Sequence, residues 1–242
     1  MPTWERRLYA AAILATPLLV LTEDRISAAV IPADTADGDA RQLAILHAIR
    51  AADGLWVVDC FVALLWGLAM VAGTIGLVKL TRRTAPRITV AAAVVGTVGA
   101  TGLCMHAVFW NVVHGGMARA ADLPAMVDFV DRTESYPPFI ATLVWVILGA
   151  DLGLVLCAAA LWRSRTVPWW AAVAAGVFPL NDFFGSQGWP YVLSCLLWVV
   201  GWGAAGLALV RRRDETVQPR PARSKASAST VSAASFSSSV EP

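Results

Sequence analysis

The chain has 242 residues, of which 57% are hydrophobic and 15% are charged, and its mean hydropathy is +0.62. Soluble domains carry about 25% charged residues, so this composition argues against an ordinary water-soluble fold and indicates a protein embedded in lipid. The formal net charge of +2 is too small to indicate a nucleic-acid-binding surface.

Six apolar segments are candidates for transmembrane helices, each of which needs roughly 20 residues to cross a bilayer. The sequence therefore predicts an all-α bundle of six transmembrane helices over residues 1–213. The Ser-, Ala-, Pro- and Arg-rich segment 214–242 is predicted to be a disordered tail. The predicted spans are Leu8–Thr22, Leu55–Leu80, Ile88–Val113, Phe139–Trp162, Val167–Gly185 and Pro190–Val210.

The first span is the shortest of the six. It follows Arg6 and Arg7, so it also resembles the apolar region of a secretory signal peptide. Pro17 lies within it and no clean small-x-small cleavage motif follows directly, so we interpret it as a retained helix. If it were cleaved, five spans would remain.

Two segments outside the spans are predicted to form short helices. In Ala40–Ala52 an apolar stripe of Leu43, Leu46 and Ile49 lies between arginines, which is typical of a helix at a membrane surface and also of a plain connecting helix. Pro124–Arg132 has a similar character.

Small residues recur every four positions in two of the spans, which favours close helix packing. The rows are Ala92, Gly96, Ala100 and Cys104 in the third span, and Gly149, Gly153 and Cys157 in the fourth. In the fifth span Pro179 removes a hydrogen bond to the carbonyl of Ala175, so we expect an interruption there.

The distribution of basic residues predicts the orientation. All but five of the 19 basic residues lie at the amino terminus, in the connections on that side or in the tail. The five on the opposite side are Arg25, Arg41, Arg50, Arg119 and Arg132. The positive-inside rule then places both termini in the cytoplasm. The Ala, Val and Arg bias suggests a bacterial source, so we expect a multi-pass protein of the bacterial cytoplasmic (inner) membrane.

Three acids lie inside the hydrophobic spans, namely Asp59, Asp151 and Asp182. An ionised carboxylate in hydrocarbon costs about 2.5–3.5 kcal/mol, so such residues usually face a cavity, a partner or a proton path. A rise of about 1.5 Å per residue puts Asp59, Asp182 and His106 in the outer half of the bilayer, and Asp151 deeper. We therefore predict Asp59, Asp182 and His106 as catalytic residues of one shared pocket.

Aromatic residues accompany these groups at similar depth. Interfacial belts explain many of the 11 tryptophans, but they explain Trp66 and Trp145 poorly because both should be deep. The predicted substrate-binding residues are Trp56, Trp66, Trp110, Asn181, Phe183, Trp189 and Asp151.

Three mechanisms fit this set of residues. A buried acid could protonate a lipophilic substrate whose carbocation the aromatic faces stabilise; the acids could relay protons or bind a transported ion; or they could pair and fix the bundle. We expect no cofactor and no metal. His106 and His114 lie about 12 Å apart along one helix, so they cannot both be axial ligands of one haem iron. No spacing typical of a zinc site is present either. The partners expected are the lipid bilayer and a lipophilic small molecule, and no nucleic acid. The alternative function is non-enzymatic, as a small transporter, immunity or accessory subunit.

Three stretches resemble a family of uncharacterised six-helix bacterial membrane proteins, described as a domain of unknown function. They are Arg7-Leu8-Tyr9-Ala10-Ala11-Ala12-Ile13-Leu14, Ile31-Pro32 followed by the Ala40–Ala52 helix, and Asp131 to Tyr136. The likeness covers about residues 5–213 and implies no known activity. In size and in its pattern of acids and aromatics the chain is also similar to small membrane-bound terpene cyclases. That resemblance implies acid-initiated cyclisation or isomerisation of an isoprenoid.

Overall fold

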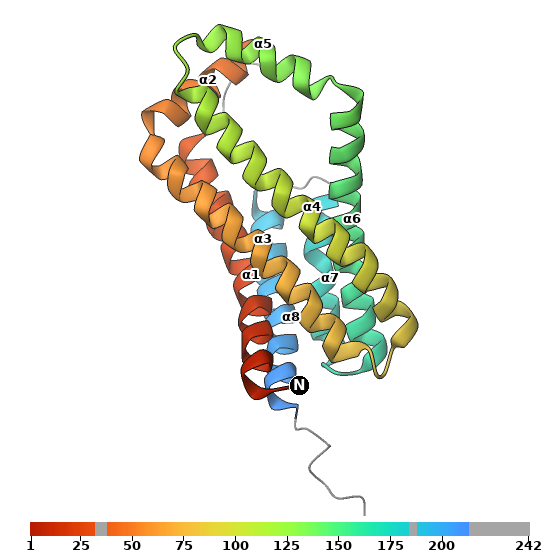
Figure 1. Ribbon diagram of the computed structural model, residues 1–242. Coiled ribbons are helices and arrows are strands. Elements are labelled where there is room, and N and C mark those ends of the chain that lie inside the picture. Colours follow the sequence, from red (N-terminus) through yellow and green to blue (C-terminus); the bar gives the residue numbers. More distant parts are fainter. Residues whose placement is uncertain (32–37, 184–187, 213–242) are drawn as a thin grey trace, which may run out of the picture. The chain divides into compact units, whose positions relative to one another are not determined.

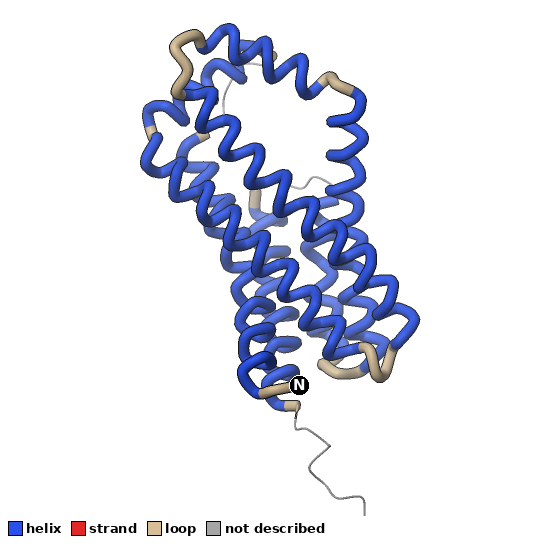
Figure 2. The backbone as a smooth tube through the Cα atoms, in the orientation of Figure 1, coloured by secondary structure: helices blue, strands red, loops and turns tan. Residues whose placement is uncertain are grey.

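The computed structural model describes residues 1–31, 38–183 and 188–212, and these residues form helices without any strand (Figure 2). The predicted all-α class is thus confirmed for the described chain. The helices are α1 (Thr3–Val30), α2 (Asp39–Ala51), α3 (Asp53–Thr81), α4 (Pro86–Ala118), α5 (Leu123–Glu134), α6 (Pro137–Ser164), α7 (Trp169–Phe183) and α8 (Trp189–Arg211).

Each predicted span coincides with one of these helices, namely α1, α3, α4, α6, α7 and α8. Three of them, α3, α4 and α8, are long and apolar enough to cross a membrane. Helices α2 and α5 form where the two short helices were expected. The predicted disordered tail, 214–242, and the end of the fifth span at Gly185 lie outside the described residues.

The six long helices pack as a closed ring in the order α1, α3, α4, α6, α7, α8 and back to α1 (Figure 1). The ring is filled mainly by side chains from all six helices, because each helix has an apolar stripe to bury. Trp198 of α8 stacks on Phe178 of α7 with ring centroids 4.3 Å apart, and it meets Trp202 edge-on at 5.1 Å. These deep tryptophans are therefore core residues.

Helices α4 and α6 make the closest contact in the ring. A Cβ atom added at Gly99 would overlap the backbone of Gly149, and one added at Gly153 would overlap the backbone of Gly96. Only glycine permits this approach. Gly96, Gly149 and Gly153 of the predicted rows lie in this packing seam. Gly99, which the rows did not include, also lies in it, whereas Cys104 of the α4 row meets Gly67 of α3. Beyond the seam α4 and α6 diverge, and α5 bridges the gap between their ends (Figure 1).

Helix α7 continues through Pro179 to Phe183, so the predicted interruption of this span is wrong. Proline removes one hydrogen bond but does not force a break where neighbouring helices hold the segment. Helix α8 supplies that support, because Gly201 lets its backbone approach Ala175 of α7 closely.

The two ends of the ring differ in composition. At one end, Lys79 of α3 forms an ion pair with Glu5 of α1, and Arg212 donates to the carbonyl of Leu80 at 2.8 Å. At the other end, α2 and α5 cover a second apolar cluster around Trp56, and Arg50 donates to the carbonyl of Ala118 at 2.5 Å. The chain thus has a basic end and a capped end.

Candidate functional site

Asp59 is the most deeply buried acid of the described chain. It lies in the second turn of α3, near the capped end, and its side chain is 0% exposed. Ser27 Oγ of α1 donates to its Oδ2 at 3.0 Å, and Asn111 Nδ2 of α4 donates to the same oxygen at 3.3 Å. The other oxygen, Oδ1, is buried without a hydrogen-bond partner. Three helices thus meet at this carboxylate, and half of its hydrogen-bonding capacity is unused.

Glu23 joins this group, and the sequence analysis missed it. The first span was expected to end at Thr22, whereas α1 continues to Val30 and carries Glu23 into the bundle. The Asn111 side chain hydrogen-bonds Glu23 as well as Asp59, and the charge of Asp59 acts on Glu23. The helical spacing of Glu23 and Ser27 beyond the apolar run was the signal that could have found it.

Trp56 fixes the position of Asn111. Its Nε1 donates to the Asn111 carbonyl at 2.8 Å, and its ring packs against Gly115 of α4. Trp56 is 2% exposed, so it braces α3 against α4 and does not line an open hollow. We refer to Glu23, Ser27, Asp59 and Asn111 as the acid–amide cluster.

A second polar group lies between α6, α7 and α8. The charge of Asp182 on α7 acts on Asp151 of α6, which is buried and has an unpartnered Oδ2. Asn181 Nδ2 donates to Ser194 Oγ at 3.2 Å, and Ser194 Oγ donates to the carbonyl of Tyr191 at 2.7 Å. Asp182 itself is exposed.

A hollow of about 380 Å³ opens where α4 and α6 diverge. It is lined by His106 and Trp110 of α4 and by Phe139 and Leu143 of α6. The ring of His106 lies 6.2 Å from that of Trp110 and 6.3 Å from that of Phe139. We call this the aromatic hollow. Its volume lies within the range of about 300–1,000 Å³ that is usual for small-molecule sites.

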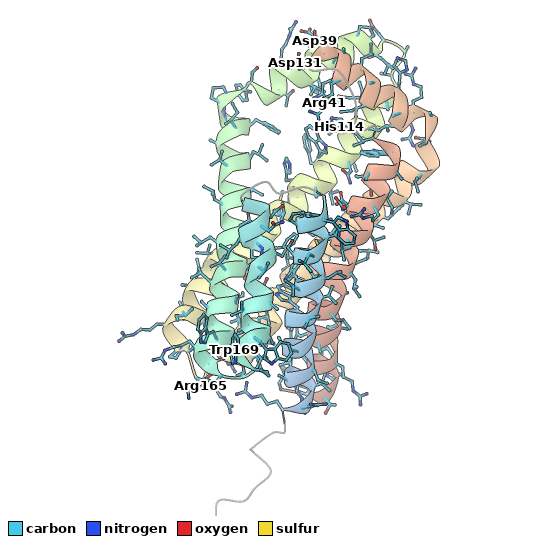
Figure 3. All side chains as sticks on the ribbon, turned by 180° about the vertical axis from the view of Figure 1, so that it is seen from behind. Asp39, Arg41, His114, Asp131, Arg165 and Trp169 are labelled. Atoms are coloured by element: carbon cyan, nitrogen blue, oxygen red, sulfur yellow. The ribbon has the colours of Figure 1, made fainter. Side chains whose placement is uncertain are left out.

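A narrower hollow continues from it toward α5. Trp110 and Phe139 line both hollows, and the narrower one adds His114, Phe129 and other residues of α4 and α5. Figure 3 shows His114 below the helix that carries Asp131, at the capped end. His114 Nδ1 lies 3.0 Å from the carbonyl of Trp110 and must be the donor of that bond, because a carbonyl only accepts. Its Nε2 is then an acceptor, and it is buried without a partner.

The predicted catalytic residues are therefore not gathered in one place. Asp59 belongs to the acid–amide cluster, Asp182 to the group near Asp151, and His106 to the aromatic hollow. Within the described ranges no hydrogen bond or electrostatic interaction joins Asp59 to Asp182.

The predicted substrate-binding residues are scattered as well. Trp110 lines the aromatic hollow, whereas Trp66 is 7% exposed in the core and has an unpartnered Nε1. Trp189 is 81% exposed at the start of α8. The side chains of Phe183 and Trp145 lie outside the described part of the chain. Among the described residues no three His, Cys, Asp or Glu side chains converge as metal ligands.

No family model matches the chain, and no curated protein or solved structure matches it either. The function is therefore inferred from the hollows and the polar groups of the described residues.

Proposed function

We propose that this chain is a six-span membrane protein with both termini in the cytoplasm, and that it binds a lipophilic, isoprenoid-like molecule in the aromatic hollow. The crowding of basic groups at one end of the ring and the coincidence of six helices with six apolar segments support the topology. The single observation that carries the binding proposal is the hollow lined by His106, Trp110, Phe139 and Leu143.

The lining matches a lipophilic ligand for physical reasons. Three of its four side chains are aromatic rings, and the neighbouring surface of α4 exposes Met105 and Phe109. A lipophilic ligand that enters between α4 and α6 would replace its contacts with lipid by contacts with aromatic rings. No charged side chain of the described residues lines the hollow, so none would lose its hydration when the ligand binds. His106 supplies one polar group to orient a hydroxyl or carbonyl head, which is the usual design of a small-molecule site.

The enzymatic extension of this proposal is acid-initiated cyclisation or isomerisation, as in membrane-bound terpene cyclases. It requires a carboxylic acid to transfer its proton to the bound alkene or epoxide, and Asp59 and Asp182 are the candidates. Neither acid lines the aromatic hollow, so the geometry favours binding over chemistry. We therefore make binding the core of the proposal, and a non-enzymatic transporter, immunity or accessory subunit is the alternative.

Photo-crosslinking in lipid nanodiscs tests the binding proposal. A benzophenone analogue of farnesol should label peptides from the α4–α6 side of the hollow, and Trp110→Ala should reduce that labelling at least several-fold. Trp169→Ala is the matched control, because Trp169 is an exposed tryptophan at the opposite end of the ring (Figure 3). Labelling spread evenly over the lipid-facing helices, or unchanged in Trp110→Ala, would contradict the proposal.

The chemical step has its own test. Membranes that contain the protein are incubated with epoxidised farnesyl derivatives, and the products are separated by mass spectrometry. If an acid initiates the reaction, Asp59→Asn or Asp182→Asn should abolish turnover. If both variants turn over substrate as fast as the wild-type protein, these two acids have no part in the mechanism. The binding proposal would not be affected by that result.

A further inference from the structure

The acid–amide cluster is a second place in the molecule whose chemistry is incomplete, and it does not depend on the aromatic hollow. Two carboxyl groups, Glu23 and Asp59, come within electrostatic reach of each other at the meeting point of α1, α3 and α4. Asp59 is fully buried, and its Oδ1 has no partner. Burying a carboxylate oxygen without a hydrogen-bond donor or a counter-ion costs free energy, and a bound cation would remove that cost.

Two neighbouring side chains donate hydrogen bonds to Asp59. Ser27 and Asn111 are both donors, and both are directed at Oδ2, as expected for a carboxylate that accepts hydrogen bonds. This arrangement leaves Oδ1 free for a different partner. Glu23 shares the Asn111 amide, so the same side chain positions both acids.

The basic groups nearby are committed elsewhere. Arg119 forms an ion pair with Asp53 at 2.7 Å, and Arg25 lies 3.5 Å from Asp24. The interactions that reach Glu23 come from Asp59, Asp24 and Asn111, and none of these is cationic. Among the described residues no ion pair joins a basic side chain to Glu23 or Asp59.

We propose that the acid–amide cluster is a binding site for a hard cation, Na⁺ or Ca²⁺. All of its ligands would be oxygens, from the carboxylates of Glu23 and Asp59, the Ser27 hydroxyl and the Asn111 amide. Oxygen-only ligand sets select Na⁺ and Ca²⁺ over zinc or copper, which favour nitrogen and sulfur. Mg²⁺ fits less well, because it keeps several waters and Asp59 is fully buried.

The position of the cluster also suggests how the cation would enter. Ser27 lies in the last turn of α1 and Asp59 in the second turn of α3, so the site is near the capped end of the ring. Glu23 and Ser27 of α1 are only partly buried, whereas Asp59 and Asn111 are buried, so an incoming ion would meet the α1 side of the cluster first. On the proposed topology, the cation would come from outside the cell.

Thermal unfolding of the full chain in detergent tests this inference. The buffer contains choline chloride at pH 8, and NaCl or CaCl₂ replaces it at equal ionic strength. One of the two should raise the melting temperature by roughly 5–10 °C at a hundredfold excess over its dissociation constant. The cation that does so identifies the occupant, and a wild-type protein that responds to neither ion would overturn the proposal.

Variants localise the effect. Asp59→Asn and Glu23→Gln should abolish the cation-dependent shift, whereas Asp151→Asn should retain it, because Asp151 is a buried acid of the other polar group. A shift that survives in Glu23→Gln and Asp59→Asn would place the ion elsewhere and refute the assignment. If Asp59→Asn fails to fold, equilibrium binding of ²²Na⁺ or ⁴⁵Ca²⁺ to the wild type decides, and it should approach one ion per chain.

Discussion

Asp131 and Asp39 are two carboxyl groups that meet outside the predicted spans, at the capped end (Figure 3). A hydrogen bond with the Asp39 side chain raises the pKa of Asp131 above its ordinary value of 3.8, and the charges of Asp39 and Asp128 act in the same direction. Two carboxyls can hydrogen-bond only while one is protonated. The contact therefore stabilises the docking of α5 on α2 at acidic pH, and that contribution is lost as pH rises through the raised pKa.

Carbon-13 NMR of labelled aspartate side chains measures this directly. Asp131 should titrate above 3.8 in the wild type, and Asp39→Asn should lower its pKa, because an amide donates to the ionised form and carries no charge. Asp122→Asn is the control, since Asp122 only caps α5 by accepting from the Ala125 N–H at 3.1 Å. An Asp131 pKa that does not respond to Asp39→Asn would show that the two groups do not interact.

At the level of single residues, sequence reasoning located the important acid but not its partners. Asp59 stood out because a carboxylate inside an apolar run is expensive whatever surrounds it. Asn111 did not stand out, because an amide in a long apolar helix carries no charge signal. Glu23 was not predicted because the apolar run ends at Thr22, whereas the helix α1 continues for two more turns.

At the level of elements, helix positions followed from composition, but the grouping of their side chains did not. Length and apolar content suffice to place a helix, because every backbone polar group in lipid must be satisfied within the segment. Depth along a helix gave Asp59, His106 and Asp182 similar levels. Depth says nothing about which neighbour a residue faces, and the ring places these three residues in separate groups. The α4–α6 seam was predictable because rows of small residues encode contact directly.

The seam makes a testable prediction about α4 and α6. Gly153→Ala should destabilise the protein by about 1–3 kcal/mol, because the new methyl group would overlap the backbone around Gly96, which cannot move aside as a side chain would. Gly116→Ala is the matched control on α4, since nothing lies within 4 Å of its added Cβ. It should be neutral or stabilising by up to about 1 kcal/mol.

Unfolding of the purified protein by SDS in mixed micelles measures both free energies. Equal effects of the two substitutions would mean that α4 and α6 are not in backbone contact in the membrane. A larger loss for Gly153→Ala than for Gly116→Ala is the result that the close approach requires.

At the level of the whole molecule, α1 is the helix that closes the ring between α3 and α8. It packs against both α3 and α8, and it brings Glu23 and Ser27 to Asp59. Gly206 of α8 approaches the backbone of Ala10, and Gly76 of α3 approaches the side chain of Tyr9. A segment that serves only as a secretory signal has no need of such fitted contacts on two sides.

We therefore expect the mature protein to retain α1. Intact mass spectrometry of the purified protein should find a chain that includes residues 3–30, and a variant that lacks them should fail to accumulate in membranes. The physical reason is that removal of α1 exposes the core faces of α3 and α8 and takes the Ser27 donor away from a buried carboxylate. A stable protein that begins near Ala33 would mean that the remaining helices close without α1. In that case Asp59 would have to find another donor, and the cation proposed for the acid–amide cluster would lose two of its ligands.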